Sequence, residues 1–154
     1  MKYILACVFC FSLISIRAQK TYTSEDAHSH NDYEQAKPFQ LAYQHQFGSI
    51  EADIWLKDGN LFVAHDAKDI NASRTLSALY LEPINNILSS GKKIYPHQQH
   101  MQLLIDIKTE ALSTLDALVA LLKKYPSIIK NKNIVIAVSG NRPQPDHCLL
   151  YTSP

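Results

Sequence analysis

The run Ser49-Ile50-Glu51-Ala52-Asp53-Ile54-Trp55-Leu56 alternates apolar and acidic side chains over most of its length. A period of two predicts a β-strand, because successive side chains of a strand point to opposite faces of the sheet. Glu51 and Asp53 then share one face, and the apolar residues between and beside them share the other. A turn signal at residues 57–60 and an apolar segment at 61–64 complete a predicted β-hairpin.

Strand-like and helical segments alternate on either side of this hairpin. A short strand is predicted to end at residues 27–30, and further strands span 101–108 and 133–138. Helices are predicted over 38–47, closed by Gly48, and over 111–124. A third is predicted over 76–89, interrupted or begun afresh at Pro83 and ended by Gly91. This order is typical of βαβ units and a parallel sheet.

The βα order predicts an α/β fold of the (β/α)8 TIM-barrel class that is truncated after the fourth strand. A closed barrel takes roughly 250 residues, whereas this chain has 154. We expect residues 19–146 to form the N-terminal half of a barrel. Residues 147–154 are interpreted as a tail of doubtful origin, because they look unlike the sequence before them.

The first eighteen residues predict a signal peptide. A basic start at Lys2 is followed by an apolar run over residues 3–16 and by Arg17-Ala18, with cleavage expected after Ala18. The expected location is therefore secreted or periplasmic. A membrane anchor is the alternative, but the uncharged stretch is shorter than the roughly 20 residues that span a bilayer.

Composition and charge exclude several classes of protein. The chain is 46% hydrophobic and 19% charged, as in ordinary globular domains. Its formal net charge is +1, and without Lys2 and Arg17 it has 13 basic and 14 acidic residues. Nucleic acid is therefore not an expected partner. Cys148 is the only cysteine after residue 18, which excludes an internal disulfide in the mature chain.

Glu51 and Asp53 point to a metal site. Two carboxylates side by side on an inward face repel each other, and a cation is the ordinary way to keep both ionised. Oxygen ligands favour Mg²⁺ or Ca²⁺. The alternative is a solvated edge strand with its polar residues outward.

Asp106 and Lys108 share one face of the strand predicted over 101–108. An acid and a base inside an otherwise apolar strand are costly unless each is paired. A functional role is one interpretation of the pair. A salt bridge between Lys108 and Asp106 at the strand end is the other.

Two histidines stand at the ends of predicted strands, where barrel enzymes keep their catalytic groups. His30 follows the first strand, and His65 follows the hairpin. Because imidazole titrates near neutrality, the pair suits a general base and a general acid on opposite sides of a metal-bound phosphate. Structural, hydrogen-bonded roles are expected for His28, His45, His97 and His100.

Together these residues resemble the front half of the glycerophosphodiester phosphodiesterase and phosphatidylinositol-phospholipase-C-like superfamily. The resemblance is carried by His30, Glu51-Ala52-Asp53, Asp58-Gly59, His65-Asp66 and Leu104-Ile105-Asp106-Ile107-Lys108. Within the superfamily, residues 28–33, 49–55 and 61–66 are most similar to the altered inheritance of mitochondria protein 6 group. The similarity runs from about residue 24 to residue 142.

The resemblance implies a phosphodiesterase-type barrel and a set of roles. His30 would be the base toward the attacking hydroxyl, His65 the acid toward the leaving alkoxide, and Lys108 a partner for the phosphoryl oxygens. One divalent metal, Mg²⁺ or Ca²⁺, would act as Lewis acid and template. Its implied ligands are Glu51, Asp53 and Asp106.

The sequence departs from the glycerophosphodiesterase pattern in two places and in one metal ligand. His30-Asn31-Asp32 stands where that family has His-Arg-Gly, and the Pro-Glu-Asn-Thr stretch that usually follows is missing around Pro38-Phe39. Asn31 replaces an arginine that contacts phosphate, and we expect it to take over part of that role as a neutral ligand or donor. Asp106 replaces the commoner glutamate, as in the sphingomyelinase D-like branch.

These departures leave several functions open. The expected substrates are glycerophosphodiesters or phospholipid headgroups, the latter at a membrane surface. The alternatives are a sphingomyelinase D-like lyase that releases a cyclic phosphate, and a non-catalytic binding barrel or inactive fragment.

Overall fold

The computed structural model describes residues 21–144, so the predicted signal peptide (1–18) and the whole of the predicted tail (147–154) lie outside the described residues. The strands are β1 (His28–Ser29), β2 (Ser49–Lys57), β3 (Asn60–Val63), β4 (Met101–Ile107) and β5 (Ile134–Gly140). The α-helices are α1 (Gln40–Gln44), α2 (Glu82–Ser89), α3 (Ala111–Leu122) and α4 (Pro126–Ile129). A five-residue π-helical segment, Ser77–Leu81, leads directly into α2.

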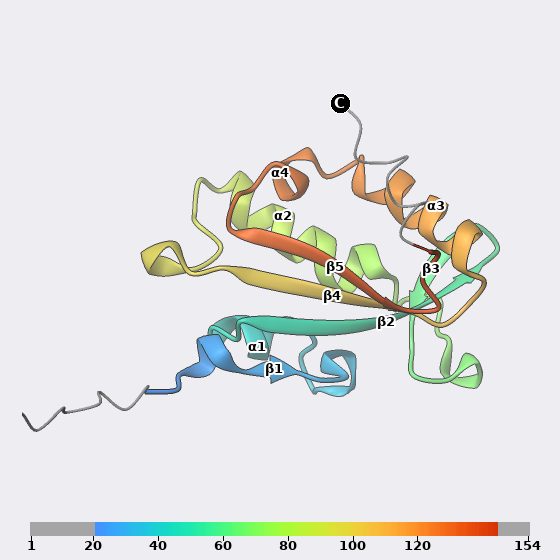
Figure 1. Cartoon of the computed structure of the whole chain (residues 1–154), viewed down its shortest axis with the longest axis horizontal. Coiled ribbons are helices and arrows are strands. Elements are labelled where there is room, and N and C mark those ends of the chain that lie inside the picture. The colour runs from blue at the N-terminus through green and yellow to red at the C-terminus, as the bar shows by residue number, and fades with distance from the viewer. Residues whose placement is uncertain (1–20, 145–154) are drawn as a thin grey trace, which may run out of the picture.

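The strands form one mixed sheet (Figure 1). β1, β2, β4 and β5 are parallel neighbours in that order, and β3 pairs antiparallel with the outer half of β2. The sheet is open, with β1 and β5 at its edges. The predicted α/β class and parallel sheet are therefore confirmed at the level of an open sheet.

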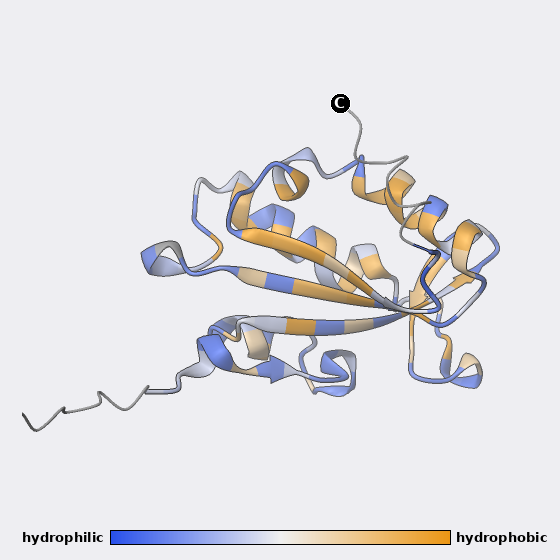
Figure 2. Ribbon diagram, viewed as in Figure 1, coloured by the Kyte–Doolittle hydropathy of each residue, from blue (hydrophilic) through white to orange (hydrophobic). Residues whose placement is uncertain are grey.

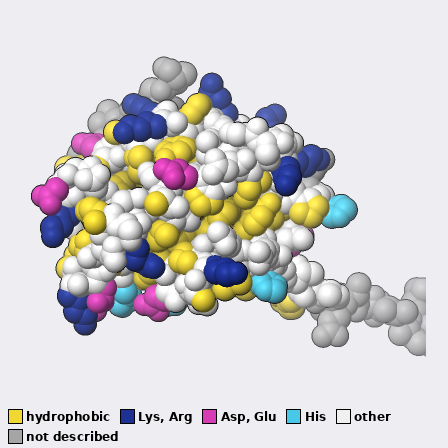
Figure 3. Space-filling model, turned by 180° about the vertical axis from the view of Figure 1, so that it is seen from behind, with side chains coloured by type: hydrophobic (Ala, Val, Ile, Leu, Met, Phe, Trp, Pro, Cys, Tyr) yellow, Lys and Arg dark blue, Asp and Glu magenta, His cyan; other side chains and the backbone are white. Residues whose placement is uncertain are grey.

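One face of the sheet carries the core. In β4 the buried residues alternate with half-exposed ones, and the apolar side chains of β2 and β4 on this face join a single hydrophobic cluster with Tyr80, Ile84 and Leu118. The alternation is visible as hydrophobic and hydrophilic bands along the strands in Figure 2. Helices α1 and α2 lie on the far side of the sheet in Figure 1. Seen from that side, hydrophobic side chains spread across the middle of the molecule (Figure 3).

The hairpin and the strands are confirmed, and α2 begins at Glu82, next to Pro83, where the π-helical segment ends. The first predicted helix is much shorter than expected. Only residues 40–44 are helical. Phe39 just before them has φ 62° and ψ −51°, and the Gln40 amide donates to the Pro38 carbonyl at 2.7 Å. This is a γ-turn of the rare positive-φ type, which delays the start of the helix.

Gly48 does not close that helix as predicted. The first residue after α1 with positive φ is Gln46. Gly48 instead lies against the backbone of Glu25, where an added Cβ would meet the Glu25 carbonyl oxygen at 1.9 Å. The glycine is required because two backbone segments pass too close for any side chain.

Within residues 21–144, no helix has both the length and the apolar character needed to cross a membrane.

Candidate active site

Polar side chains form a row across the carboxyl ends of three parallel strands. Asp53 of β2 is in register with Asp106 of β4, which is in register with Ser139 of β5. Asp53 is 1% exposed and Glu51 9%. Because β2 is an inner strand and both carboxylates are buried, the solvated-edge interpretation of the Glu51 and Asp53 pair is wrong.

Lys108 holds two carboxylates of this row together. Its Nζ lies 2.5 Å from Asp106 Oδ2 and 2.9 Å from Asp53 Oδ2. Burial by itself would lower the pKa of Lys108, but the hydrogen bonds that its ammonium donates to Asp106 and Asp53 outweigh that effect and raise the pKa. The salt bridge between Lys108 and Asp106, one of the two interpretations of the sequence, is therefore present, and Lys108 also pairs with Asp53.

At the β5 end of the row, Gly140 lies very close to the Asp106 carboxylate. Ser139 Oγ donates to Asp106 Oδ1 at 2.8 Å. Gly140 has φ +72°, and a Cβ there would meet Asp106 Oδ1 and the Ile107 carbonyl oxygen at 2.5 Å each. A side chain at this position would displace the Asp106 carboxylate.

Glu51 is surrounded by groups from the first strand and the residues after it. Its Oε2 lies 3.1 Å from His28 Nε2 and 3.8 Å from His30 Nε2, and it accepts a hydrogen bond from the Asn31 amide at 3.3 Å. His28 also contacts Ser49 Oγ through Nδ1 at 2.9 Å, as expected of a hydrogen-bonded structural histidine. His30 is exposed on 73% of its side chain and so is open to a substrate.

His65 lies on the other side of the carboxylates. Its Nδ1 is 3.4 Å from Asp53 Oδ2 and 3.3 Å from Tyr33 Oη, and its side chain is 53% exposed. Tyr33 Oη donates to Asp53 Oδ2 at 2.8 Å. Burial first, and then the hydrogen bond to Asp53, raise the pKa of Tyr33 far above its usual range, so this phenol keeps its proton.

The sequence pattern assigned Asp32 and Tyr33 no role of their own in the site, although residues 28–33 carry part of the family resemblance. Both are buried in the 3₁₀ turn η2 (Asp32–Glu34). The Asp32 carboxylate accepts hydrogen bonds from Ser29 Oγ at 2.9 Å, the Phe39 amide at 2.5 Å and Tyr80 Oη at 3.0 Å. The available signal was an aromatic residue beside an acid in an otherwise polar stretch.

The predicted metal ligands are only partly brought together. Asp53 and Asp106 meet at Lys108, whereas Glu51 faces the histidines. In the described part of the chain, no group of three His, Cys, Asp or Glu side chains is arranged to hold a metal ion. The chemistry of the donors nevertheless fits a hard cation, because all are carboxylates. Asp53 Oδ1 is buried without a hydrogen-bond partner among the described residues, and such an oxygen calls for a cation or a donor.

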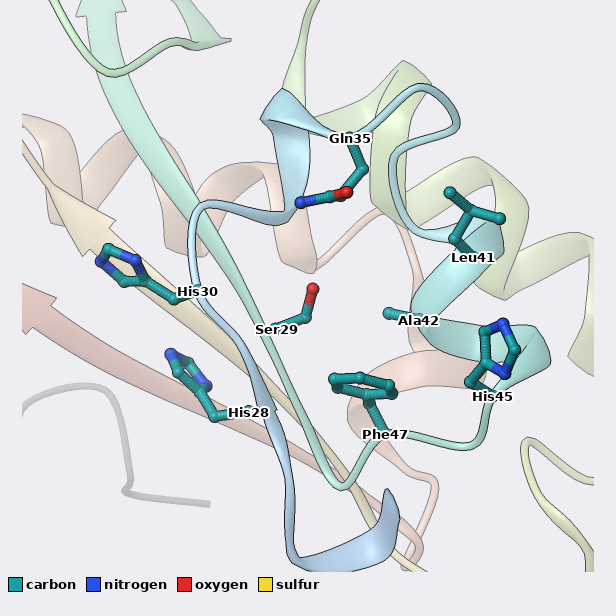
Figure 4. A pocket seen from close by; sticks show the side chains of 8 residues that line it. All are labelled: His28, Ser29, His30, Gln35, Leu41, Ala42, His45 and Phe47. Carbon is teal, nitrogen blue, oxygen red and sulfur yellow. The ribbon is translucent and has the colours of Figure 1, made fainter.

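A cavity of about 410 Å³ lies beside this site, on the other flank of β1. Figure 4 shows His28 and His30 pointing to one side of β1, away from Ala42 and Phe47 on the other. The wall formed by α1 and the residues after it is largely apolar, with His45 at its rim. His30 therefore lies between the carboxylates and an apolar cavity.

Comparison with known proteins identifies the family. Residues 17–143 match the model of the AIM6-like phosphodiesterase domain. The chain belongs to this family. The resemblance to the altered inheritance of mitochondria protein 6 group is thereby confirmed.

Curated relatives of this AIM6-like domain agree with the assignment. One is an altered inheritance of mitochondria protein 6 homolog of Arthroderma benhamiae, which is 40% identical over 67 residues, or 40% of this chain and 21% of that protein. Altered inheritance of mitochondria protein 6 of Kluyveromyces lactis is 32% identical over 112 residues, or 55% of this chain and 27% of that protein. Matches thus cover between 16% and 27% of the relatives' length. No solved structure matches the chain.

Proposed function

We propose that the AIM6-like domain belongs to a secreted or periplasmic, metal-dependent phosphoric diester hydrolase acting on glycerophosphodiesters or phospholipid headgroups. The parallel order β1, β2, β4, β5 is the order expected of one half of a (β/α)8 barrel. The observation that carries the proposal is the position of the two histidines. His30 lies beside Glu51 and His65 beside Asp53, so the imidazoles flank the carboxylates at the carboxyl end of the strands.

This arrangement suits acid–base catalysis on a phosphodiester. His30 is largely exposed, and its imidazole takes the proton of the attacking hydroxyl as the new P–O bond forms. His65 directs Nδ1 toward Asp53 and Tyr33, which leaves Nε2 to give a proton to the departing alkoxide as the old P–O bond breaks. Lys108 carries the positive charge nearest to Asp53 and Asp106 and lies where it can also approach phosphoryl oxygens.

A divalent cation, Mg²⁺ or Ca²⁺, would be held by Glu51, Asp53 and Asp106, with Asp53 Oδ1 as an available buried oxygen. When bound, it would supply Lewis-acid stabilisation of the phosphoryl charge. Asn31 would contribute its side-chain amide to the substrate, because its main-chain amide is already used by Glu51.

Attack by a hydroxyl of the substrate itself would give a cyclic phosphate, which water then opens. An enzyme that stops at the cyclic product would be a lyase of the sphingomyelinase D-like kind. ³¹P NMR of the products separates these outcomes, because the cyclic and open phosphates have different chemical shifts.

The test is turnover of bis(p-nitrophenyl) phosphate by the full-length protein with and without EDTA. His30→Ala and His65→Ala should each lower kcat by about 10²- to 10⁴-fold, the usual contribution of a general acid or base. His100→Ala, an exposed histidine at the opposite end of β4, is the matched control. Full activity in either catalytic-site variant would refute the proposal, and no turnover by the wild-type protein would favour a non-catalytic binding role.

A further inference from the structure

Tyr33 connects residues of the site that the sequence placed in separate roles. Its side chain is buried, its hydroxyl donates to Asp53 Oδ2 at 2.8 Å, and the same oxygen lies 3.3 Å from His65 Nδ1. Asp53 is a proposed metal ligand and His65 the proposed acid. One phenol therefore touches both groups without itself facing the exposed side of the site.

The contacts on Asp53 are strongly one-sided. Oδ2 faces Tyr33 Oη, Lys108 Nζ at 2.9 Å and His65 Nδ1 at 3.4 Å. Oδ1 has no hydrogen-bond partner among the described residues. Rotation of the carboxylate would break three polar contacts, so the direction of the free oxygen is fixed by the partners of the other one.

The turn that carries Tyr33 is itself held firmly. The adjacent Asp32 carboxylate is fully buried and binds the amide of Phe39, a residue with unfavourable positive φ. The Arg74 guanidinium donates to the Tyr33 carbonyl oxygen. A strained residue persists only where its surroundings over-determine it, and such residues cluster at functional sites. The position of the Tyr33 hydroxyl is therefore set by the fold and not by solvent.

We propose that Tyr33 is a positioning residue that acts through Asp53 and His65. It holds the Asp53 carboxylate so that Oδ1 is directed to a divalent cation, and it keeps the proton of neutral His65 on Nδ1. This inference rests on the proposed function.

The hydrogen-bond roles follow from the inventory of donors. A carboxylate only accepts, and the single proton of the Tyr33 hydroxyl is already donated to Asp53. His65 Nδ1 can approach both oxygens favourably only as an N–H donor. The lone pair of the neutral ring is then on Nε2, the nitrogen that must take up a proton before it can give one to the leaving alkoxide.

The first experiment measures cation affinity without turnover. Mg²⁺ and, separately, Ca²⁺ are titrated by calorimetry into the full-length protein and into its Tyr33→Phe variant. Removing an outer partner of a metal ligand typically weakens binding 10- to 100-fold, and we expect a loss in this range. Tyr95→Phe is the matched control, because it removes another buried hydroxyl, which donates to the Phe47 carbonyl at 2.9 Å. Since this hydroxyl contacts none of the proposed metal ligands, the variant should change cation affinity less than about twofold.

The second experiment reads the His65 tautomer. Long-range ¹H–¹⁵N spectra of histidine-labelled protein, assigned with His65→Gln, are recorded about two pH units above the usual histidine pKa. Tyr33→Phe should lower the ratio of the Nδ1–H to the Nε2–H form by about two- to tenfold, the equilibrium change that one lost hydrogen bond produces. Tyr95→Phe should leave the ratio unchanged.

The two readings separate the inference from the proposed function. If the wild type binds a cation and Tyr33→Phe matches it in affinity and tautomer, the inference is overturned while the proposed function stands. If the wild type binds neither ion, the metal-dependent function falls, and the tautomer alone decides whether Tyr33 positions His65. If Tyr33→Phe does not fold, 3-fluorotyrosine at position 33 keeps the ring and hydroxyl and makes the hydroxyl a stronger hydrogen-bond donor. Unchanged affinity and tautomer would then overturn the inference.

Discussion

Leu104 and Ile105 are neighbours in β4, yet they belong to two regions with different physics. Ile105 is fully buried among side chains of the helix-covered face, whereas Leu104 is half-exposed on the face that carries Asp53 and Asp106. The covered face is held by non-directional apolar contacts. The other face is held by a few charged and directional contacts around Lys108 and Asp53. Stability and chemistry are thus divided between the two faces of one strand.

The largest expected effect comes from breaking the covered face. Ile105→Ala should lower the free energy of unfolding by about 2–5 kcal/mol, because it removes buried methyl groups and leaves a cavity. Leu104→Ala, one residue away, should cost at most about 1 kcal/mol. Urea denaturation of the two variants measures the difference. Equal losses would show that the two faces contribute alike to stability.

A smaller effect is expected at the buried carboxylate behind the site. Asp32→Asn should cost about 1–3 kcal/mol, because at least one of its three donors loses a charged acceptor in a buried place. Asp66→Asn is the control, since Asp66 is exposed and pairs with exposed Lys68 at 3.4 Å. The control should change stability by less than about 1 kcal/mol. An unaffected Asp32→Asn variant in urea denaturation would mean that the turn does not depend on this charge.

A weaker, pH-dependent effect is expected from Lys108. Its pKa is raised in the folded state above the value of 10.5 for a free side chain, so its ion pairs stabilise the fold at lower pH. That contribution is lost as the pH rises through the folded pKa. The stability gap between wild type and Lys108→Met should therefore narrow above pH 10.5.

Urea denaturation across this pH range measures the gap, which should be about 1 kcal/mol or less for a partly exposed lysine. Lys57→Met, at the exposed end of β2, is the control for loss of one positive charge. A gap that stays constant with pH would contradict the role given to the ion pairs.

The smallest effect lies outside both faces, at the start of α3. Glu110 accepts hydrogen bonds from the Ser113 and Leu112 amides, which lower the pKa of its carboxyl to about 2. This stabilisation is present above the ordinary carboxyl pKa of 4.5 and is lost as the pH falls toward 2. Stability measured over this range should fall more steeply in wild type than in Glu110→Gln. Identical slopes would show that this cap contributes nothing measurable.

Much of the fold could be predicted because its signals are local. The alternation in residues 49–56 and 101–108 places apolar residues on one face wherever the strands pair. The same alternation put Glu51, Asp53 and Asp106 on the opposite face. No distant contact was needed for either inference.

The missed parts depend on distant contacts. Asp32 and Tyr33 are buried because Tyr80 and Asp53 reach them from far along the chain. Gly48 looked like a helix end because its neighbour in space, Glu25, is not its neighbour in sequence. The pairing of Lys108 with Asp53 as well as Asp106 likewise required the register of β2 and β4, which the pattern of either strand alone does not contain.

The contact between Gly48 and the Glu25 backbone fixes the register of β1 against β2. His28 lies three residues beyond Glu25, and Glu51 lies three residues beyond Gly48, so their side chains arrive together across β1 and β2. Insertion or deletion of one residue in either interval would turn the following side chain to the other face. The site therefore tolerates changes in residue type at Ala27 or Ser49 better than any change in the number of residues between these points.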